Sequence, residues 1–170
     1  MINNHNKKII SADLIADYFI WTANNKKKPI TNKKLQKLLY YAQAWYLVFY
    51  GKPLFKDKIE AWIHGPAIKS IYRKYKPFGF GPIKKEIKDQ EIKQIDLKAK
   101  KLLQEVWEVY GKYDGDYLEI LTHNESPWQN AREKLDICQA SDTVISVDSM
   151  KAFYTEKLEK SKSLKHGSRK

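Results

Sequence analysis

The chain has 170 residues, 42% of them hydrophobic and 13% aromatic, and this composition excludes a globally disordered protein. Its formal net charge of +12 favours anionic partners, such as nucleic acid, acidic proteins or a membrane surface, without choosing among them. The single cysteine, Cys138, excludes an intrachain disulfide. Because the N-terminus lacks a sustained apolar core and no apolar run reaches the ~20 residues that span a bilayer, we expect a cytoplasmic protein without membrane insertion.

A first helix is expected between Ser11 and about Asn24, after a polar and flexible N-terminal segment, residues 1–10. The hydroxyl of Ser11 is suited to cap this helix, because it can accept from a free backbone N–H of the first turn. A basic loop at residues 24–29 then separates the first helix from a second one.

The second helix is expected to be the centre of the fold. Thr31 is a suitable N-cap, and Gly51 lies where a left-handed residue ends a helix, so the helix should cover residues 32–50. Twelve of the thirteen residues from 38 to 50 are apolar or aromatic, and Gln43 is the exception. A helix that is apolar nearly all round is enclosed by its neighbours or by a partner.

The next segment mixes strand and turn signals. Residues 59–63 alternate apolar and polar side chains, which predicts a short strand. Pro66 suits the first position of a helix that continues to about residue 76, because its missing N–H would be unpaired there anyway. The sequence PFGFGP at residues 77–82 is expected to form a rigid aromatic turn on the core. Residues 83–95 allow two alternatives, a second strand pairing with 59–63 or a mobile arm.

The C-terminal half contains further helix starts, and together these elements predict a mainly α fold (α+β). We expect a single domain at residues 11–158, a compact bundle of about six helices around the central apolar helix with a small two-stranded β element. Residues 159–170 are expected to be a disordered basic tail. The expected N-caps of the later helices are Asp96, Asp114 or Asp116, Ser126 and Ser146.

No motif gives positive support for catalysis or for a cofactor. The histidines match no metal-ligand spacing, and residues 77–82 lack the lysine and the serine or threonine of a phosphate-binding loop. Glu125 follows His123 by two residues, and a hydrogen bond between them is expected to hold a turn. We therefore expect neither an enzyme nor a bound metal or cofactor, and an enzyme with His64 or His123 in a cleft stays the third hypothesis.

A DNA-binding regulator is the second hypothesis. The first helix, the basic loop and the second helix could form a helix-turn-helix, although the loop exceeds the usual three to four residues. The residues that would face the groove are Asn32, Lys33, Lys34, Gln36 and Lys37.

A protein-binding role is indicated by the aromatic content. Five tryptophans and eleven tyrosines are more than a small core needs, and both residue types are favoured anchors of protein interfaces. The alternative is a tyrosine-rich core whose polar tips reach the surface.

Four segments in order resemble the Panacea antitoxin domain, the family of SocA-type, phage-associated antitoxins. They are KLQKLLYYAQAWYL (34–47), GKPLF (51–55), IEAWIHGPAIKSIYRKY (59–75) and LTHNESPWQNAR (121–132). The resemblance extends over residues 14–154 and implies an antitoxin that neutralises a cognate toxin, encoded by an adjacent gene, through direct protein binding. The SocA-type member resembles a proteolytic adaptor, which adds a protease as a further expected partner, whereas nucleic acid is the less favoured one.

The resemblance also assigns the residues expected to shape the binding surface. Lys37, His123, Glu125 and Arg132 are the least easily explained by packing, and we expect them to form one polar cluster at the core edge. The positions that match the family motifs are Leu35, Gln36, Lys37, Leu38, Tyr40, Trp62, His64, Gly65, Pro66, Tyr72, His123, Glu125, Pro127, Trp128 and Arg132.

Overall fold

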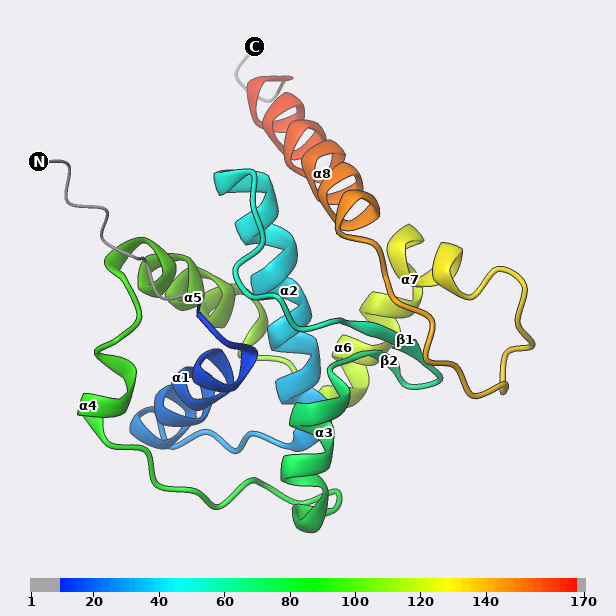
Figure 1. Ribbon diagram of the computed structural model, residues 1–170. Helices are drawn as coiled ribbons and strands as arrows, with labels where there is room; N and C mark the ends of the chain where they lie inside the picture. Colours follow the sequence, from blue (N-terminus) through cyan, green and yellow to red (C-terminus); the bar gives the residue numbers. More distant parts are fainter. Residues whose placement is uncertain (1–9, 168–170) are drawn as a thin grey trace, which may run out of the picture.

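Helix α2 (Asn32–Tyr50) lies at the centre of the fold in the computed structural model, which describes residues 10–167, with side chains through residue 164 (Figure 1). The helix begins and ends at the residues that the sequence predicts. The Thr31 side chain accepts from the backbone N–H of Lys34, and Gly51 closes the helix in the left-handed conformation with φ +69°. Of its 19 residues 14 are buried, so α2 is enclosed by the rest of the chain.

The other helices surround α2 and confirm the predicted mainly α fold. Helices α1, α5, α6 and α8 pack directly against it, and their buried faces form one continuous core. Side-chain caps start all four of these helices, because each capping oxygen accepts a backbone N–H that the helix leaves free. The helices are α1 (Ala12–Asn25), α3 (Lys69–Tyr75), α4 (Asp89–Ile92), α5 (Leu97–Tyr110), α6 (Gly115–His123), α7 (Ser126–Ala131) and α8 (Val147–Gly167), with a 3₁₀ helix at Lys76–Phe78.

The β element is a two-stranded antiparallel hairpin of β1 (Glu60–Trp62) and β2 (Gly65–Ala67). The predicted helix start at Pro66 is therefore wrong, because Pro66 pairs with Ala61 in the hairpin and α3 begins only at Lys69. Backbone hydrogen bonds to residues 143–145 cover the other edge of β1.

Both alternatives for residues 83–95 are also wrong. The segment contains α4 and pairs with no part of residues 59–63. It is not a free arm, because four isoleucines are buried against the core: Ile83, Ile87, Ile92 and Ile95.

Helix α8 continues beyond its predicted end at residue 158 and reaches Gly167, so residues 159–167 are helical instead of a disordered tail. The last turns of α8 extend beyond the helical bundle (Figure 1). Lysine and glutamate are good helix formers, and Glu156 and Lys160 form an ion pair one turn apart, which supports helix without burial. The predicted flexibility of residues 1–9 and the end of the tail, 168–170, lie outside the described residues.

Candidate functional site

The first turns of α2 direct polar side chains into the protein instead of toward solvent. Lys34 Nζ donates to the carbonyl oxygen of Gly111 (2.6 Å), and Gln36 Oε1 accepts from the backbone N–H of Ile68 (2.8 Å). Because these groups are buried and occupied, they cannot read a DNA groove, and the predicted helix-turn-helix surface is wrong. The buried polar residues of this region are Asn32, Lys34, Gln36 and Lys37.

Lys37 is the most deeply buried cation of this region, with an exposed fraction of 2%. Its Nζ donates to the carbonyl oxygen of Pro66 at 3.1 Å. Burial lowers the pKa of Lys37 to about 7, an effect that Glu119 opposes and Lys33 reinforces. Near neutral pH the side chain therefore exchanges between neutral amine and ammonium.

Gly65 provides the space that the end of the Lys37 side chain occupies. Its φ is +90°, a conformation that residues with a Cβ rarely adopt. A Cβ here would lie 2.7 Å from Lys37 Cε and 2.8 Å from Thr122 Oγ1. The glycine of the motif is thus required both by the hairpin turn and by the close approach of the lysine.

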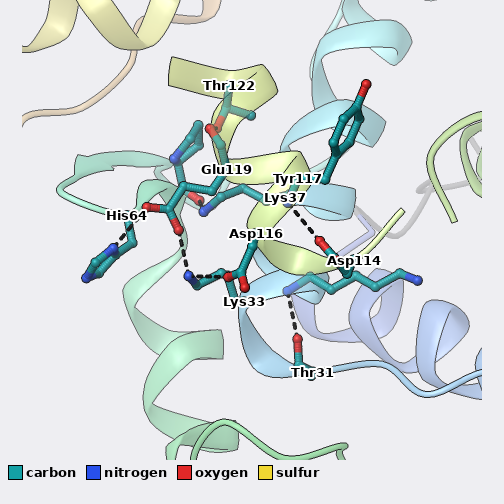
Figure 2. Close-up of polar contacts among 11 residues, drawn as sticks. Thr31, Lys33, Lys37, His64, Asp114, Asp116, Tyr117, Glu119 and Thr122 are labelled. Carbon is teal, nitrogen blue, oxygen red and sulfur yellow. Dashed lines mark hydrogen bonds and ion pairs between the residues drawn. The ribbon is translucent and has the colours of Figure 1, made fainter. Parts of the chain in front are cut away.

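A chain of ion pairs lies beside Lys37 at the protein surface (Figure 2). Glu119 on α6 contacts His64 Nδ1 at 3.0 Å and Lys33 Nζ at 2.6 Å, and Lys33 also reaches Asp116 at 2.8 Å. Burial alone would raise the pKa of Glu119, but the hydrogen bonds from Lys33 and His64 outweigh it and hold that pKa below its usual value. The carboxylate therefore stays charged and joins α6 to α2 and to the hairpin turn.

A second group of motif residues lies around α7. His123 stacks on Trp128 with ring centroids 4.0 Å apart, and the Arg132 guanidinium lies 5.3 Å from the Trp128 ring centroid. Arg132 donates to the carbonyl oxygens of Ala61 (2.8 Å) and Gln139 (2.7 Å), which ties α7 to β1 and to the following loop. Burial lowers the pKa of His123, whose Nε2 has no hydrogen-bond partner among the described residues.

Glu125 lies apart from both groups and faces the core between α2 and α8. Its Oε2 accepts from the hydroxyls of Tyr40 (3.1 Å) and Tyr154 (2.6 Å), and Lys157 donates to Oε1 at 3.4 Å. Burial raises the pKa of Glu125, although these hydrogen bonds oppose the shift. Of the residues expected in one polar cluster, His123 does interact electrostatically with Lys37, whereas the Glu125 side chain fastens α8 to α2 instead of holding a turn with His123.

A cavity of about 340 Å³ opens between the start of α2, the hairpin and α3. Trp62 and Tyr72 form an aromatic wall, with ring centroids 4.9 Å apart in an edge-to-face arrangement. The structure thus brings six of the motif residues to one cavity, with the large side chain of Phe80 at its rim. These seven residues are Gln36, Lys37, Trp62, His64, Gly65, Tyr72 and Phe80.

Two features of this site were missed by the sequence analysis. Asp116 and Glu119 are three residues apart and share one face of α6, a local spacing that could have suggested a paired acidic surface. Their partner Lys33 is more than 80 residues away in the sequence, so the ion pairs themselves had no local signal. Phe80 was expected in a loop on the core, yet 97% of it is exposed.

The chemistry of the site favours binding. A buried amine, an imidazole–carboxylate hydrogen bond and an aromatic wall meet at the cavity, and they suit a partner with both apolar and acidic groups. Within residues 10–167, no cluster of three or more His, Cys, Asp or Glu side chains is arranged to hold a metal ion. In the same range, no helix has the length and apolar character needed to cross a membrane.

Comparison with known proteins identifies a family whose model matches this chain. The family model "Antitoxin SocA-like, Panacea domain" matches residues 35–129. Antitoxin SocA of Caulobacter vibrioides (strain NA1000 / CB15N) is 39% identical to this chain over 64 residues, which are 38% of this chain and 34% of that relative. The match therefore spans about a third of the length of the curated relative. No solved structure is a significant match to the chain.

Proposed function

This chain belongs to the family of SocA-like antitoxins with a Panacea domain, and from that membership we propose that it is the antitoxin of a bacterial or phage toxin–antitoxin pair. It neutralises a cognate toxin, encoded by an adjacent gene, through direct protein–protein binding in the cytoplasm. The role is non-enzymatic, and any protease would act on the complex as a further partner.

The observation that carries this proposal is the position of the cavity within the family-matched segment. Residues 35–129 contain both strands of the hairpin, α3 and most of α2, and these elements form the walls of the cavity. Motif residues thus converge on a concave, aromatic-lined surface, and such surfaces are suited to partner recognition.

The buried network around Lys37 supports binding through a preformed surface. Lys37, Gly65 and the Glu119 ion pairs fix the hairpin against α2 and α6 before any partner arrives. A surface that is ordered in advance loses less conformational entropy on association, so more of the contact free energy is available for affinity.

The test is a growth assay with the reading frame next to this chain's gene. The neighbour is induced in a bacterial host, with and without this chain, and a tagged copy of the chain is then purified from the rescued cells. We expect growth arrest by the neighbour, rescue by the chain and co-purification of the two proteins. A neighbour that is toxic but is neither rescued nor bound would contradict the proposal.

A further inference from the structure

Phe80 is held in an exposed position at the rim of the cavity. The loop that carries it is fastened on both sides, since Phe78 is half-buried against Tyr75 and the backbone N–H of Ile83 donates to the carbonyl oxygen of Ile30 at 2.8 Å. Phe80 itself is 97% exposed. A large aromatic side chain on a fastened loop offers apolar area at a small entropic cost, which is a property of interface anchors.

Unpaired positive charge lies on α3 and, through Lys76, at the cavity itself. Lys69 and Arg73 on α3, together with Lys76 at the cavity, are exposed and have no carboxylate partner among the described side chains. In contrast, Lys33 is occupied by Asp116 and by Glu119. The edge of the cavity at α3 is therefore basic, which suits an acidic partner.

On the premise of the proposed function, we propose that the cavity and Phe80 form the docking surface for the toxin, and that the surface takes an acidic segment bearing a large apolar side chain. That side chain enters the cavity against Trp62 and Tyr72, and Phe80 covers it from the rim. The neighbouring carboxylates of the segment face Lys76, Lys69 and Arg73.

The size and shape of the surface favour a protein segment over a small molecule. A volume of about 340 Å³ accommodates one large side chain. Phe80 and the basic edge of α3 lie at or beyond the rim of the cavity. A small molecule confined to the cavity would therefore leave these groups uncovered. A partner with a surface wider than the cavity contacts all of these groups at once, and the net charge of +12 favours an acidic one.

The experiment measures the dissociation constant of the toxin identified by the growth assay, with Phe80→Ala and Lys76→Glu as test variants. Matched controls are Leu97→Ala, because Leu97 is 83% exposed on α5, and Lys52→Glu, because Lys52 is exposed at the opposite end of α2. We expect each test variant to weaken binding about tenfold or more and each control to stay within about twofold. The loss in Lys76→Glu should shrink at high salt, since it is electrostatic.

A charge reversal in the toxin gives the second arm. An acidic residue of the toxin changed to lysine should restore affinity to Lys76→Glu while weakening binding to the unchanged antitoxin. If the unchanged proteins bind tightly but both test variants bind equally well, the docking surface is overturned and the antitoxin function stands. If the unchanged chain fails to bind or rescue, the proposed function and this inference fail together. If Phe80→Ala and Lys76→Glu lose binding to a DNA duplex but still bind the toxin as the unchanged chain does, the inference is also overturned.

Discussion

At the residue scale, Lys37 makes the stability of the protein depend on pH. Its pKa is about 7 in the folded protein, below the ordinary lysine value of 10.5 that applies to the unfolded chain. Between these values the unfolded chain binds the proton and the folded protein releases it, so stability rises with pH. Below pH 7 the Lys37 amine is protonated in both the folded and the unfolded state, and the stabilisation that is present at higher pH is lost.

We therefore predict that unfolding free energy increases by roughly 1 kcal/mol per pH unit between pH 7 and 10 through Lys37. Urea denaturation of the wild type, Lys37→Met and Lys52→Met at pH 7, 8 and 9 measures this. Lys37→Met should lack the increase, whereas Lys52→Met should keep it because Lys52 is exposed. If the unfolding free energy of Lys37→Met rises with pH as steeply as that of the wild type, the Lys37 amine stays charged in the folded state over this pH range.

Two buried tyrosines in the same aromatic cluster, Tyr41 and Tyr154, differ in their hydroxyl partners. The Tyr154 hydroxyl donates to Glu125 at 2.6 Å, whereas the Tyr41 hydroxyl has no partner among the described residues. Loss of a buried hydrogen bond to a charged group costs about 2 kcal/mol, but removal of an unpaired buried hydroxyl is neutral or favourable.

Tyr154→Phe should accordingly destabilise the protein by about 2 kcal/mol, and Tyr41→Phe should change stability by less than about 0.5 kcal/mol. Chemical denaturation of both variants gives the comparison, with Tyr41→Phe as the matched control for ring volume. Equal costs for the two changes would argue against Glu125 as the group that fastens α8.

The residue scale is also where sequence reasoning failed most clearly at the site. Under the DNA-binding hypothesis Lys34 and Lys37 were expected to face a groove, but their acceptors are the carbonyl oxygens of Gly111 and Pro66. These acceptors lie 77 and 29 residues further along the chain. A basic helix start has the same local sequence whether it faces DNA or is enclosed by its own protein, so tertiary contacts had to decide.

At the element scale, two glycines allow the stability cost of a left-handed backbone conformation to be measured apart from the cost of a steric clash. Gly51 and Gly65 both have positive φ, at +69° and +90°. A Cβ at Gly51 meets nothing within 4 Å, whereas at Gly65 it would meet the Lys37 side chain and Thr122. The two positions form a natural pair for measurement.

We predict that Gly51→Ala costs about 1 kcal/mol, the cost of the left-handed conformation alone. Gly65→Ala should cost clearly more, because the buried end of Lys37 and the Thr122 hydroxyl must also shift. Thermal and urea denaturation measure both, and the affinity for the toxin should fall in Gly65→Ala only. A smaller cost at Gly65 than at Gly51 would contradict the account of the Lys37–Gly65 contact.

The elements themselves were predictable where their signals are local. Ser11, Thr31 and Asp96 each cap a helix that begins at the expected residue, because a cap acts on the next three residues only. The strand at residues 59–63 was predicted, but its partner was missed since Pro66 fits a helix start as well as a strand, and only its pairing with Ala61 distinguishes the two. The end of α8 was missed because its polar composition resembles a disordered tail.

At the scale of the whole molecule, the elements cooperate to present one surface. Helix α2 is enclosed on most sides and holds its polar start against the hairpin and α6, which places the aromatic wall and the basic edge of α3 beside each other. Composition indicated an anionic partner and the motifs indicated a family, but neither located the surface. Its position depends on contacts between distant segments, such as that between Lys33 and Glu119, which are 86 residues apart in the sequence.

The most direct test of the account is neutralisation in a purified system without any protease. The toxin's own activity is measured while the chain is added in increasing amounts, and complex formation is followed in the same samples. The account predicts a saturable loss of toxin activity that parallels complex formation at a fixed stoichiometry. Toxin that stays fully active while bound, and is silenced only after a protease is added, would contradict neutralisation by direct binding.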